Sequence, residues 1–455
     1  MNNRIFRRSC AACIALAFTV LTPLAQAADQ AKVLRLSTST AETSYDNAFA
    51  SDESSQTITE RINEPMLEYH YLARPAKLVP RTLEALPAIS DNGATFLCKL
   101  QKGVFFADDT AFQGKPRELT AADYAYSLKR LLDPAVKSPW LFLVEGKIIG
   151  GDEARAAAAK TGKFDYDTPM PGLEVVDRYT LRIRLKAPDY NFAYLLAMPA
   201  TGASAREAVE RYGLDYGSSP VGTGAYQLLR SEYKRASKTV LVKNPNYRKR
   251  VWDWASDAAE DQAMVKAMRG KAVPSIDRIE VYPIEEGQAS WLAFLSGQHD
   301  YLPILPASVS NVAKSEGKLK PEYEQQGIRL FPRMKPNVWY TMFNMNDPIT
   351  GGYTREKIAL RRAISLGYPL DEQIRVVFQG DGLAGKGIVP PGVVGHDDKR
   401  PRAHVYDPAL AKALLDRFGY KDRDGDGYRE MPDGSPLIIP YVARTSGIED
   451  RKSVV

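Results

Sequence analysis

The first 27 residues constrain the fold more than any other feature, because they are typical of an export signal. Three arginines within residues 4–8 precede the apolar run 11–21, and an Ala-Gln-Ala sequence ends at Ala27. A basic region, a short apolar run and an A-x-A site predict a secretory signal peptide over residues 1–27. The run is shorter than the ~20 residues of a membrane-spanning helix. We expect a periplasmic product without membrane insertion of the mature chain; the alternative is the amphipathic start of a cytosolic protein.

Export would leave a chain that no internal disulfide can stabilise. The sequence contains three cysteines, and Cys10 and Cys13 fall inside the predicted signal peptide. Cys98 alone cannot form an internal disulfide, so the exported chain must be stabilised by its hydrophobic core. Residues 94–100 have the pattern of a strand, in which a buried and unreactive thiol is expected.

The composition excludes several function classes. Hydrophobic residues make up 44% and charged residues 25% of the 455 positions, an ordinary balance for a globular protein of about two to four domains. The net charge of +6 is too small and too dispersed for a nucleic-acid-binding surface. Four histidines and three cysteines leave little material for a Cys/His metal cluster. We expect no nucleic-acid partner, no cofactor and no metal centre of that kind.

Strands and helices alternate irregularly, without a repeat of fixed period, which predicts an α/β protein with mixed sheets. The clearest helix begins at Thr120, where Thr120 and Asp123 form a capping box before an apolar face. Another helix has both ends marked, by Asp407-Pro408 and by Gly419. The alternating residues 95–106 predict a hairpin. Further strands are expected at 33–37, 226–229, 238–243 and 279–283, a strand pair at 175–185, and helices at 56–63 and 286–295.

Three short motifs are similar to those of serine enzymes that react with penicillin: Ser231-x-x-Lys, Ser90-Asp-Asn and Lys160-Thr-Gly. In those enzymes the nucleophile motif comes first in the chain and opens a helix, so that its lysine reaches the serine. Here that motif comes last and lies between strand-like runs. The order of the motifs therefore argues against an enzyme of this class.

Residues 422–427 have the sequence Asp-Arg-Asp-Gly-Asp-Gly. Carboxylates at positions 1, 3 and 5 with glycine at position 6 are what a calcium-binding loop requires. Position 12 is Asp433 rather than the longer glutamate, which weakens bidentate closure around the ion. Aspartate and glycine are also the ordinary residues of a turn between a helix and a strand. We expect a solvated turn, with calcium binding as the alternative.

Several segments, in a common order along the chain, resemble the family 5 solute-binding proteins of ABC importers, the peptide-, dipeptide- and nickel-binding group. The most recognisable are the Pro-Val-Gly-Thr-Gly-Ala-Tyr sequence at 220–226 and the Lys-Asn-Pro-Asn-Tyr sequence at 243–247. The similarity extends from about residue 33 to near the end of the sequence. The other similar segments are 103–109, 119–131, 295–300, 360–364, 389–392, 406–415 and 419–420.

This resemblance implies an α/β, bilobal periplasmic-binding-protein fold (type II, large peptide-binding class) with mixed sheets and an extra subdomain. Lobe I would comprise residues 28–70 and 200–285, the extra subdomain 71–199, and lobe II 286–455. The family implies a monomeric binding protein without catalytic activity. It would capture a peptide or similar small solute in a cleft between the lobes and deliver it to an ABC permease in the inner membrane. A periplasmic sensing or chaperone-like protein on the same scaffold is the alternative.

The resemblance also suggests ligand-binding residues. The loop that lies beside the ligand backbone in peptide-binding relatives corresponds to Ser51, Asp52 and Glu53, with a plain polar loop as the alternative. Trp140 resembles an aromatic position facing the cleft, where a ring offers contact area that tolerates different side chains; core packing is the alternative. Arg444 lies where a dipeptide-binding relative places an arginine for the ligand carboxylate, a role that suits a guanidinium, with an ordinary surface arginine as the alternative.

The sequence departs from the family pattern at its end. Family members continue through a segment with Asp, Tyr and Pro, which supplies the aspartate for the amino terminus of a peptide, and then return to the first lobe. This sequence ends at Val455 without such a segment. We expect either a fragment or a truncated gene product. The sequence does not specify which solute is bound.

Overall fold

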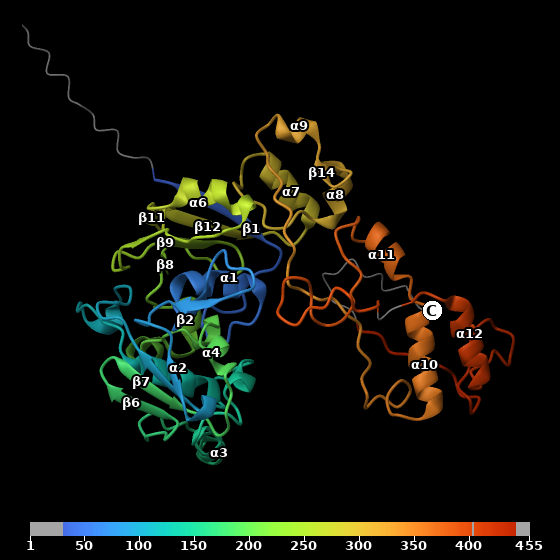
Figure 1. The fold of residues 1–455 in the computed structure, drawn as a ribbon, viewed down its shortest axis with the longest axis horizontal. Helices are drawn as coiled ribbons and strands as arrows, with labels where there is room; N and C mark the ends of the chain where they lie inside the picture. The colour runs from blue at the N-terminus through green and yellow to red at the C-terminus, as the bar shows by residue number, and fades with distance from the viewer. Residues whose placement is uncertain (1–30, 403–404, 443–455) are drawn as a thin grey trace, which may run out of the picture.

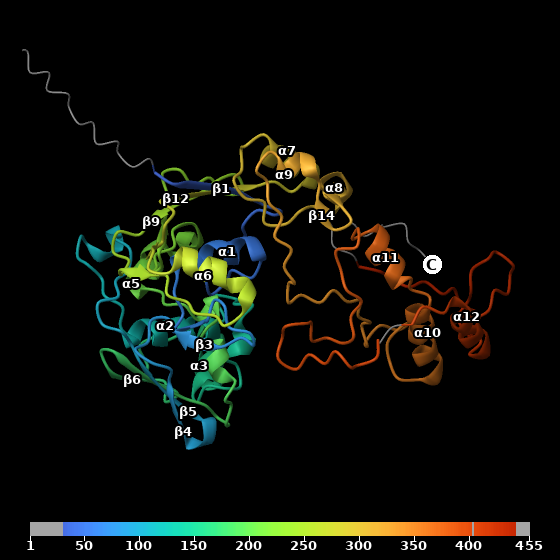
Figure 2. The ribbon, with the colours of Figure 1, turned by 45° about the horizontal axis from the view of Figure 1, so that its top comes forward.

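The computed structural model describes residues 31–402 and 405–442. The predicted signal peptide and Arg444 lie outside these residues. Figures 1 and 2 show the sheets close together in the part coloured blue to yellow-green, a small helical unit beside them, and further helices set apart in orange and red. None of the helices within the described ranges is long and apolar enough to span a bilayer.

The first sheet joins the beginning of the chain to residues more than two hundred positions later. Its order is β1-β12-β9-β8, with β1 parallel to β12 and the other pairs antiparallel. Helix α1 (Glu53–Ile62) contributes Ile58 and Ile62 to the core beneath this sheet, together with Leu241 and Val281. The strands are β1 (Val33–Thr38), β8 (Tyr226–Leu228), β9 (Thr239–Lys243) and β12 (Arg278–Pro283). The strands expected in these regions are confirmed.

The second sheet is antiparallel and has the order β4-β5-β7-β6. Helix α2 (Ala121–Leu132) begins at Thr120 with the predicted capping box, and its Leu128, Leu131 and Leu132 are fully buried in the largest core of the molecule. The strands are β4 (Ala88–Ser90), β5 (Thr95–Lys99), β6 (Leu173–Asp177) and β7 (Thr180–Arg184). The pair β6–β7 is the one that the sequence predicts. Cys98, on β5, has no exposed surface.

The hairpin expected over residues 95–106 is wrong. Strand β5 ends at Lys99 and pairs with β4 before it and with β7 much later in the chain. The residues that follow make only isolated bridges, Leu83 with Leu100 and Phe105 with Glu118. Alternation of apolar residues shows which face of a strand is buried, but it does not identify the neighbouring strand. Here the neighbour is β7, because its Leu181 and Ile183 share the buried face with β5.

Shorter elements complete this part of the chain. A small satellite core forms around Leu72, Trp252 and Val265, where a two-stranded ladder and a helix pack against the loop that contains Leu72. The elements are β2 (Leu67–Tyr69), β3 (Leu78–Pro80), α3 (Gly151–Thr161), α4 (Phe192–Leu195), α5 (Arg206–Tyr212), β10 (Arg250–Val251), α6 (Gln262–Met268) and β11 (Ala272–Val273).

Beyond β12, a helical unit has its own small core around Trp291, Val309 and Ala313. This unit is tied back to the first sheet. The hydroxyl groups of Ser37 and Ser290 lie 2.9 Å apart in a buried position, and Tyr301 forms a bridge with Leu36 of β1. Its elements are α7 (Gly287–Leu295), α8 (Ala307–Ala313), β13 (Lys314–Ser315), β14 (Lys318–Leu319) and α9 (Pro321–Glu324). The helix expected at 286–295 is confirmed.

The last described part contains α10 (Arg355–Leu366), α11 (Leu370–Val376) and α12 (Pro408–Arg417). Helix α12 begins as predicted, with the Asp407 carboxylate accepting a hydrogen bond from the Leu410 amide at 2.8 Å. Helices α10 and α12 pack against each other, and the Asp407 amide donates to the Leu366 carbonyl at 2.8 Å. Residues 328–354 lead to these helices without forming a helix or strand.

Candidate functional site

A hydroxyl-rich loop follows β1 and leads into α1, and it contains three of the predicted ligand-binding residues. The hydroxyl groups of Thr40 and Ser54 lie 2.9 Å apart, and Ser55 Oγ accepts a hydrogen bond from the Thr43 amide at 2.9 Å. These bonds join the two ends of residues 38–55. The loop is therefore held in one shape by its own side chains.

Asp52 is the N-cap of α1. Its Oδ1 accepts a hydrogen bond from the Ser55 amide at 2.8 Å, and its other oxygen accepts one from the Thr43 hydroxyl. Partial burial opposes ionisation of this carboxyl, but the hydrogen bonds from Thr43 and Ser55 outweigh it and hold the pKa of Asp52 below its ordinary value. Asp52 therefore caps α1 and stabilises the conformation of the loop.

Ser51 and Glu53, on either side of Asp52, face solvent. Both residues are exposed, and the Glu53 side chain keeps 78% of its accessible surface. Glu53 Oε1 lies 3.3 Å from Lys335 Nζ, which belongs to the irregular segment 328–354. The contact joins the beginning of α1 to the segment that leads to the distant helices α10–α12.

Trp140 holds the same loop from the side of the largest core. Its indole Nε1 donates a hydrogen bond to the Ala50 carbonyl at 2.9 Å, and the ring is half-buried against the largest core. The neighbouring Ser138 hydroxyl donates to the Ala48 carbonyl at 2.5 Å. Trp140 therefore fixes the position of residues 48–50 through its one polar atom.

Two exposed aromatic residues beside this anchor were missed from the sequence. Phe49 lies on the loop and is 42% exposed, and Phe142 is 61% exposed with its ring 6.1 Å from that of Trp140. The sequence did offer a signal: Phe49 directly precedes the candidate loop residues Ala50–Glu53, and Phe142 is two residues after Trp140. The exposed rings, one on the loop and one beside Trp140, offer the apolar contact area that the resemblance assigned to Trp140.

The glycine-rich sequence 221–225 fixes the other end of α1. The Gly224 amide donates to the Ile62 carbonyl at 2.7 Å, and a Cβ atom at Gly222 would lie 2.0 Å from the same oxygen. No other residue fits this close approach of two backbones. The hydroxyl of Thr223 donates to Glu64 at 3.1 Å.

Glu64 is a fully buried carboxylate, which was also missed from the sequence. Arg81 Nε lies 2.7 Å from one of its oxygens and Arg248 Nη1 lies 2.7 Å from the other. Burial would raise the pKa of Glu64, but the two guanidinium groups outweigh burial and hold it below its ordinary value. The cluster joins α1, the β2–β3 hairpin and the segment after β9, so it stabilises the scaffold behind the loop.

The chain is similar to a family of known proteins. A family model described as bacterial extracellular solute-binding proteins, family 5 middle, matches residues 77–451. The chain belongs to this family. The resemblance inferred from the sequence is confirmed.

Family 5 members that are similar in sequence include two glutathione-binding proteins. GsiB of Salmonella choleraesuis (strain SC-B67) is 26% identical over 343 residues, which are 73% of this chain and 52% of that protein. GsiB of Escherichia coli (strain K12) is 24% identical over 336 residues, 73% of this chain and 51% of that protein. The chain therefore spans about half the length of the curated relatives it matches.

Solved structures show the same fold. The E. coli murein tripeptide binding protein MppA superposes with a TM-score of 0.64 at 21% identity, covering 86% of this chain and 67% of that one. The Helicobacter pylori periplasmic binding protein DppA, in complex with peptide STSA, gives 0.61 at 20% identity, covering 85% and 66%. The bilobal periplasmic-binding-protein fold with mixed sheets is confirmed.

The three serine-enzyme motifs do not form the arrangement that such an enzyme needs. Ser231 lies in a turn between β8 and β9, so Lys234 does not lie one helical turn from it. Ser90 ends β4, and Lys160 lies in the last turn of α3. The family members found by comparison are binding proteins rather than enzymes.

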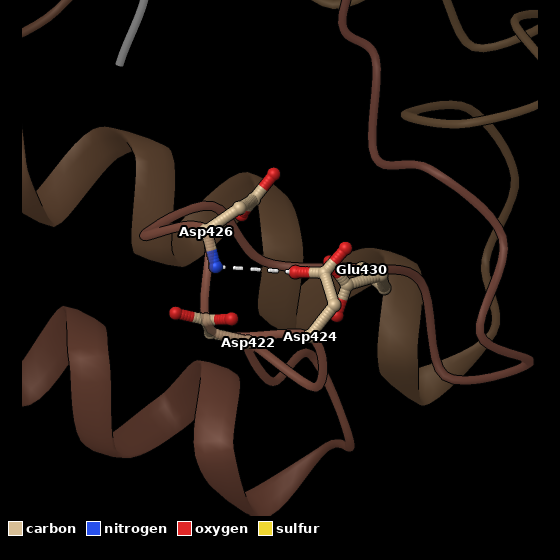
Figure 3. Close-up of side chains that lie close together, drawn as sticks. All are labelled: Asp422, Asp424, Asp426 and Glu430. Atoms are coloured by element: carbon tan, nitrogen blue, oxygen red, sulfur yellow. Dashed lines mark hydrogen bonds between the residues drawn. The ribbon is translucent and has the colours of Figure 1, made fainter.

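The acidic turn after α12 gathers four carboxylates, as Figure 3 shows. Asp422, Asp424, Asp426 and Glu430 have carboxylate oxygens within 4.8 Å of one another, and the three aspartates are exposed. These groups also accept hydrogen bonds from the loop itself: Asp422 from the Gly425 amide at 2.7 Å, and Asp424 from the Asp426 amide at 3.2 Å.

The fourth carboxylate of this turn is Glu430, not Asp433 as the spacing of a calcium loop suggested. Asp433 instead accepts a hydrogen bond from the Ser435 amide at 2.9 Å. The hydrogen bonds of residues 422–430 are those of an ordinary aspartate-glycine turn. The solvated turn stays the prediction for this segment, with calcium binding as its alternative.

Proposed function

We propose that this chain is the solute-capturing component of an ABC importer, and that its solute is a short peptide or a similar small molecule. The family match over residues 77–451 carries this proposal. The names of similar proteins support it, since they include glutathione-binding, murein tripeptide-binding and peptide-complexed members. All three names describe short chains of amino acids.

In this proposal the ligand lies against the loop that precedes α1. Ser51 and Glu53 are exposed and would contact the ligand, whereas Asp52 and Trp140 hold the loop through the Ser55 amide and the Ala50 carbonyl. Arg444 would bind a ligand carboxylate by analogy with a dipeptide-binding relative. A carboxylate at Glu53 suits a cationic group of the ligand, because its present partner, Lys335, is an exposed ammonium.

The lobes and partners follow the family pattern. Residues 28–70 and 200–285 would form lobe I, 71–199 an extra subdomain, and 286–455 lobe II. The protein would act as a monomer in the periplasm after removal of residues 1–27, and would deliver its ligand to an ABC permease in the inner membrane. It would carry out no chemistry on the solute.

Ligand-linked thermal stabilisation tests the proposal. The intact gene product is heated with glutathione and with a library of di- to pentapeptides. A ligand at about one hundred times its dissociation constant should stabilise the protein by about 2.7 kcal/mol. Glu53→Gln should weaken binding of the ligand found, whereas Glu372→Gln, an exposed glutamate on α11, should leave it unchanged. No stabilisation by any peptide would remove this substrate class, and protection of unfolded proteins instead would favour the chaperone-like alternative.

A further inference from the structure

His299 is a buried imidazole without a hydrogen-bond partner. Only 5% of its surface is exposed, and neither ring nitrogen has a partner within the described residues. The nearest ring is that of Tyr282, at 5.7 Å and a tilt of 51°. A buried polar side chain that makes no hydrogen bond is costly, so it needs an explanation.

His299 lies where the α7–α9 unit is attached to strand β1; we call residues 298–302 and their contacts with β1 the joint. The chain leaves the first sheet at the end of β12, forms α7, and returns to the sheet directly after His299. On its return, the Asp300 amide donates to the Arg35 carbonyl at 2.9 Å, and the Arg35 amide donates to Asp300 Oδ2 at 2.8 Å. The next residue, Tyr301, forms the bridge with Leu36. His299 is thus buried where the α7–α9 unit is attached to β1.

The acidic groups around the joint are already engaged by cations. Glu280, on β12, accepts hydrogen bonds from Arg278 Nε at 2.7 Å and from the Tyr282 hydroxyl at 2.8 Å. Its oxygens also lie 3.7 Å from Lys238 Nζ and 3.9 Å from Arg35 Nε.

Among the described residues, the other groups that face the joint offer the ring no acceptor either. Asp300 is held by Arg35, whose Nη1 lies 3.6 Å from it. The ammonium of Lys238 lies over the Tyr282 ring, 5.8 Å from its centroid, which is in the range of a cation–π contact. Helices α7 and α8 carry no titratable side chain.

We propose that His299 makes the attachment of the α7–α9 unit to β1 sensitive to acid. At neutral pH the imidazole is uncharged and stays buried against Tyr282. Protonation would place a cation in a buried site where the described carboxylates, Glu280 and Asp300, are already paired with other cations. Burying an unpaired charge is strongly unfavourable. The protonated side chain therefore favours a state in which residues 298–302 open from β1 and the ring reaches water.

The direction of this effect follows from the two states of the ring. Burial lowers the pKa of His299, and the charge of Asp300 only partly opposes this. The open state, with an ordinary imidazole, therefore binds a proton at a higher pH than the closed state. The closed joint is fully stable above about pH 6.5 and loses stability as the pH falls below that value.

The joint is connected to the loop that precedes α1. Strand β1 holds Arg35 and Leu36 on one side of this attachment, and its last residue, Thr38, begins the loop that ends at Asp52. Opening of the joint would free one edge of β1 at its carboxyl end. The proposal concerns the fold itself, so it stands whether or not the solute is a peptide.

Hydrogen–deuterium exchange tests the proposal on the full chain. Peptides covering residues 286–302 are compared at pH 7.5 and pH 5.0, after correction for the intrinsic exchange rate. In the unaltered protein their opening should increase several-fold at pH 5.0, because the open state takes up a proton more readily than the closed state. In His299→Leu, which replaces the imidazole with an apolar side chain of similar size that cannot take up a proton, the increase should stay below about twofold.

The matched control is His396, a described histidine in the last part of the chain whose side chain is 14% exposed and has hydrogen-bond partners. Its ring lies 2.8 Å from the Val389 carbonyl and 2.9 Å from Asp398, bonds that raise its pKa. His396→Gln should leave the acid response of residues 286–302 unchanged. An unaltered response in His299→Leu, or its loss in His396→Gln, would overturn the proposal.

If His299→Leu does not fold, the protonation of His299 can be measured directly in the unaltered protein. The ring nitrogens of the unaltered protein, labelled with nitrogen-15, are titrated by NMR. The proposal requires that the His299 ring of the closed state takes up its proton at a lower pH than a free imidazole does. Titration at or above about pH 6.5 would refute it.

Discussion

Helices α2 and α12 have similar local signals but very different surroundings. Both begin at a polar capping residue and carry an apolar face of leucines. In α2, Leu128, Leu131 and Leu132 have no exposed surface, whereas in α12 Leu410 is 49% exposed and only Ala411 is buried. Local signals therefore specify that a helix forms, and the packing around it decides how much of its apolar face is buried.

The same contrast holds for the regions that contain these helices. The two sheets in residues 31–285 enclose an extensive core, whereas in the described part of 328–442 the buried apolar side chains are few. They are Ala359, Leu360, Ala363, Ala411 and Tyr420. Many large apolar side chains there are exposed, among them Phe331, Trp339, Tyr340, Met342 and Ile388. Such a surface is uncommon on soluble monomers and is typical of an interaction face or of an aggregation hazard.

The largest expected effect tests this contrast with one type of substitution in both helices. Leu128→Ala, in α2, should lower the free energy of unfolding by about 2–5 kcal/mol, because it leaves a cavity in the main core. Leu410→Ala, in α12, should lower it by less than about 1 kcal/mol, because that side chain is half-exposed. Urea unfolding followed by circular dichroism measures both. Equal losses would contradict the contrast.

The buried carboxylate of the first region gives the next largest effect. Glu64→Gln should lower the free energy of unfolding at pH 7 by about 3 kcal/mol, because Arg81 and Arg248 lose their buried partner. The pKa of Glu64 is held below its ordinary value, so the unaltered protein should lose this contribution as the pH falls below about 4.3. Urea midpoints between pH 3 and 7 should therefore converge for the two proteins at the acid end. Parallel curves would show that the carboxylate is not stabilised by its arginines.

Helix caps should have the same effect in both regions, because they act locally. Asp407→Ala removes the carboxylate that accepts a hydrogen bond from the Leu410 amide, and Thr120→Ala removes the hydroxyl of the capping box of α2. Each should cost about 1 kcal/mol. Exchange of the amides in the first turn of each helix measures the local loss. A cost several times larger at Thr120 would mean that the cap acts through the core rather than locally.

The smallest effect belongs to the ion pair that joins the two regions. Lys335→Ala should change the free energy of unfolding by less than about 1 kcal/mol, since both Lys335 and Glu53 are exposed. Glu53→Gln should give the same small value. The effect of the double substitution should be close to the sum of the two single effects. A coupling energy above about 1 kcal/mol would show that the pair holds the two regions together.

Several elements of both regions could be predicted because their signals are local. The capping box at Thr120, the turn between β6 and β7, and the Asp407-Pro408 start of α12 each depend on a few neighbouring residues. The pairing of β5 with β7 could not be predicted, because those strands are about eighty residues apart and alternation does not name a partner.

The candidate site shows the same limit. Family resemblance pointed to Ser51, Asp52, Glu53 and Trp140, and the structure places all four around the start of α1. The sequence did not distinguish the residues that hold the loop from those that face solvent. That distinction depends on hydrogen bonds to distant backbone atoms, such as the one from Trp140 to Ala50. The burial of Glu64 between two arginines depends equally on residues far apart in the chain.

The position of Cys98 on β5 has a practical consequence for following motion in this protein. Burial raises the pKa of its thiol to about 12, so the side chain stays protonated and out of reach of a maleimide reagent. In a chain lacking residues 1–27, a dye would therefore react only with cysteines added on purpose. Glu210→Cys and Glu372→Cys, both on exposed helix faces, would carry a fluorescent donor and acceptor. Energy transfer between them would report the movement of α11 relative to α5 in single molecules, with the native cysteine left in place.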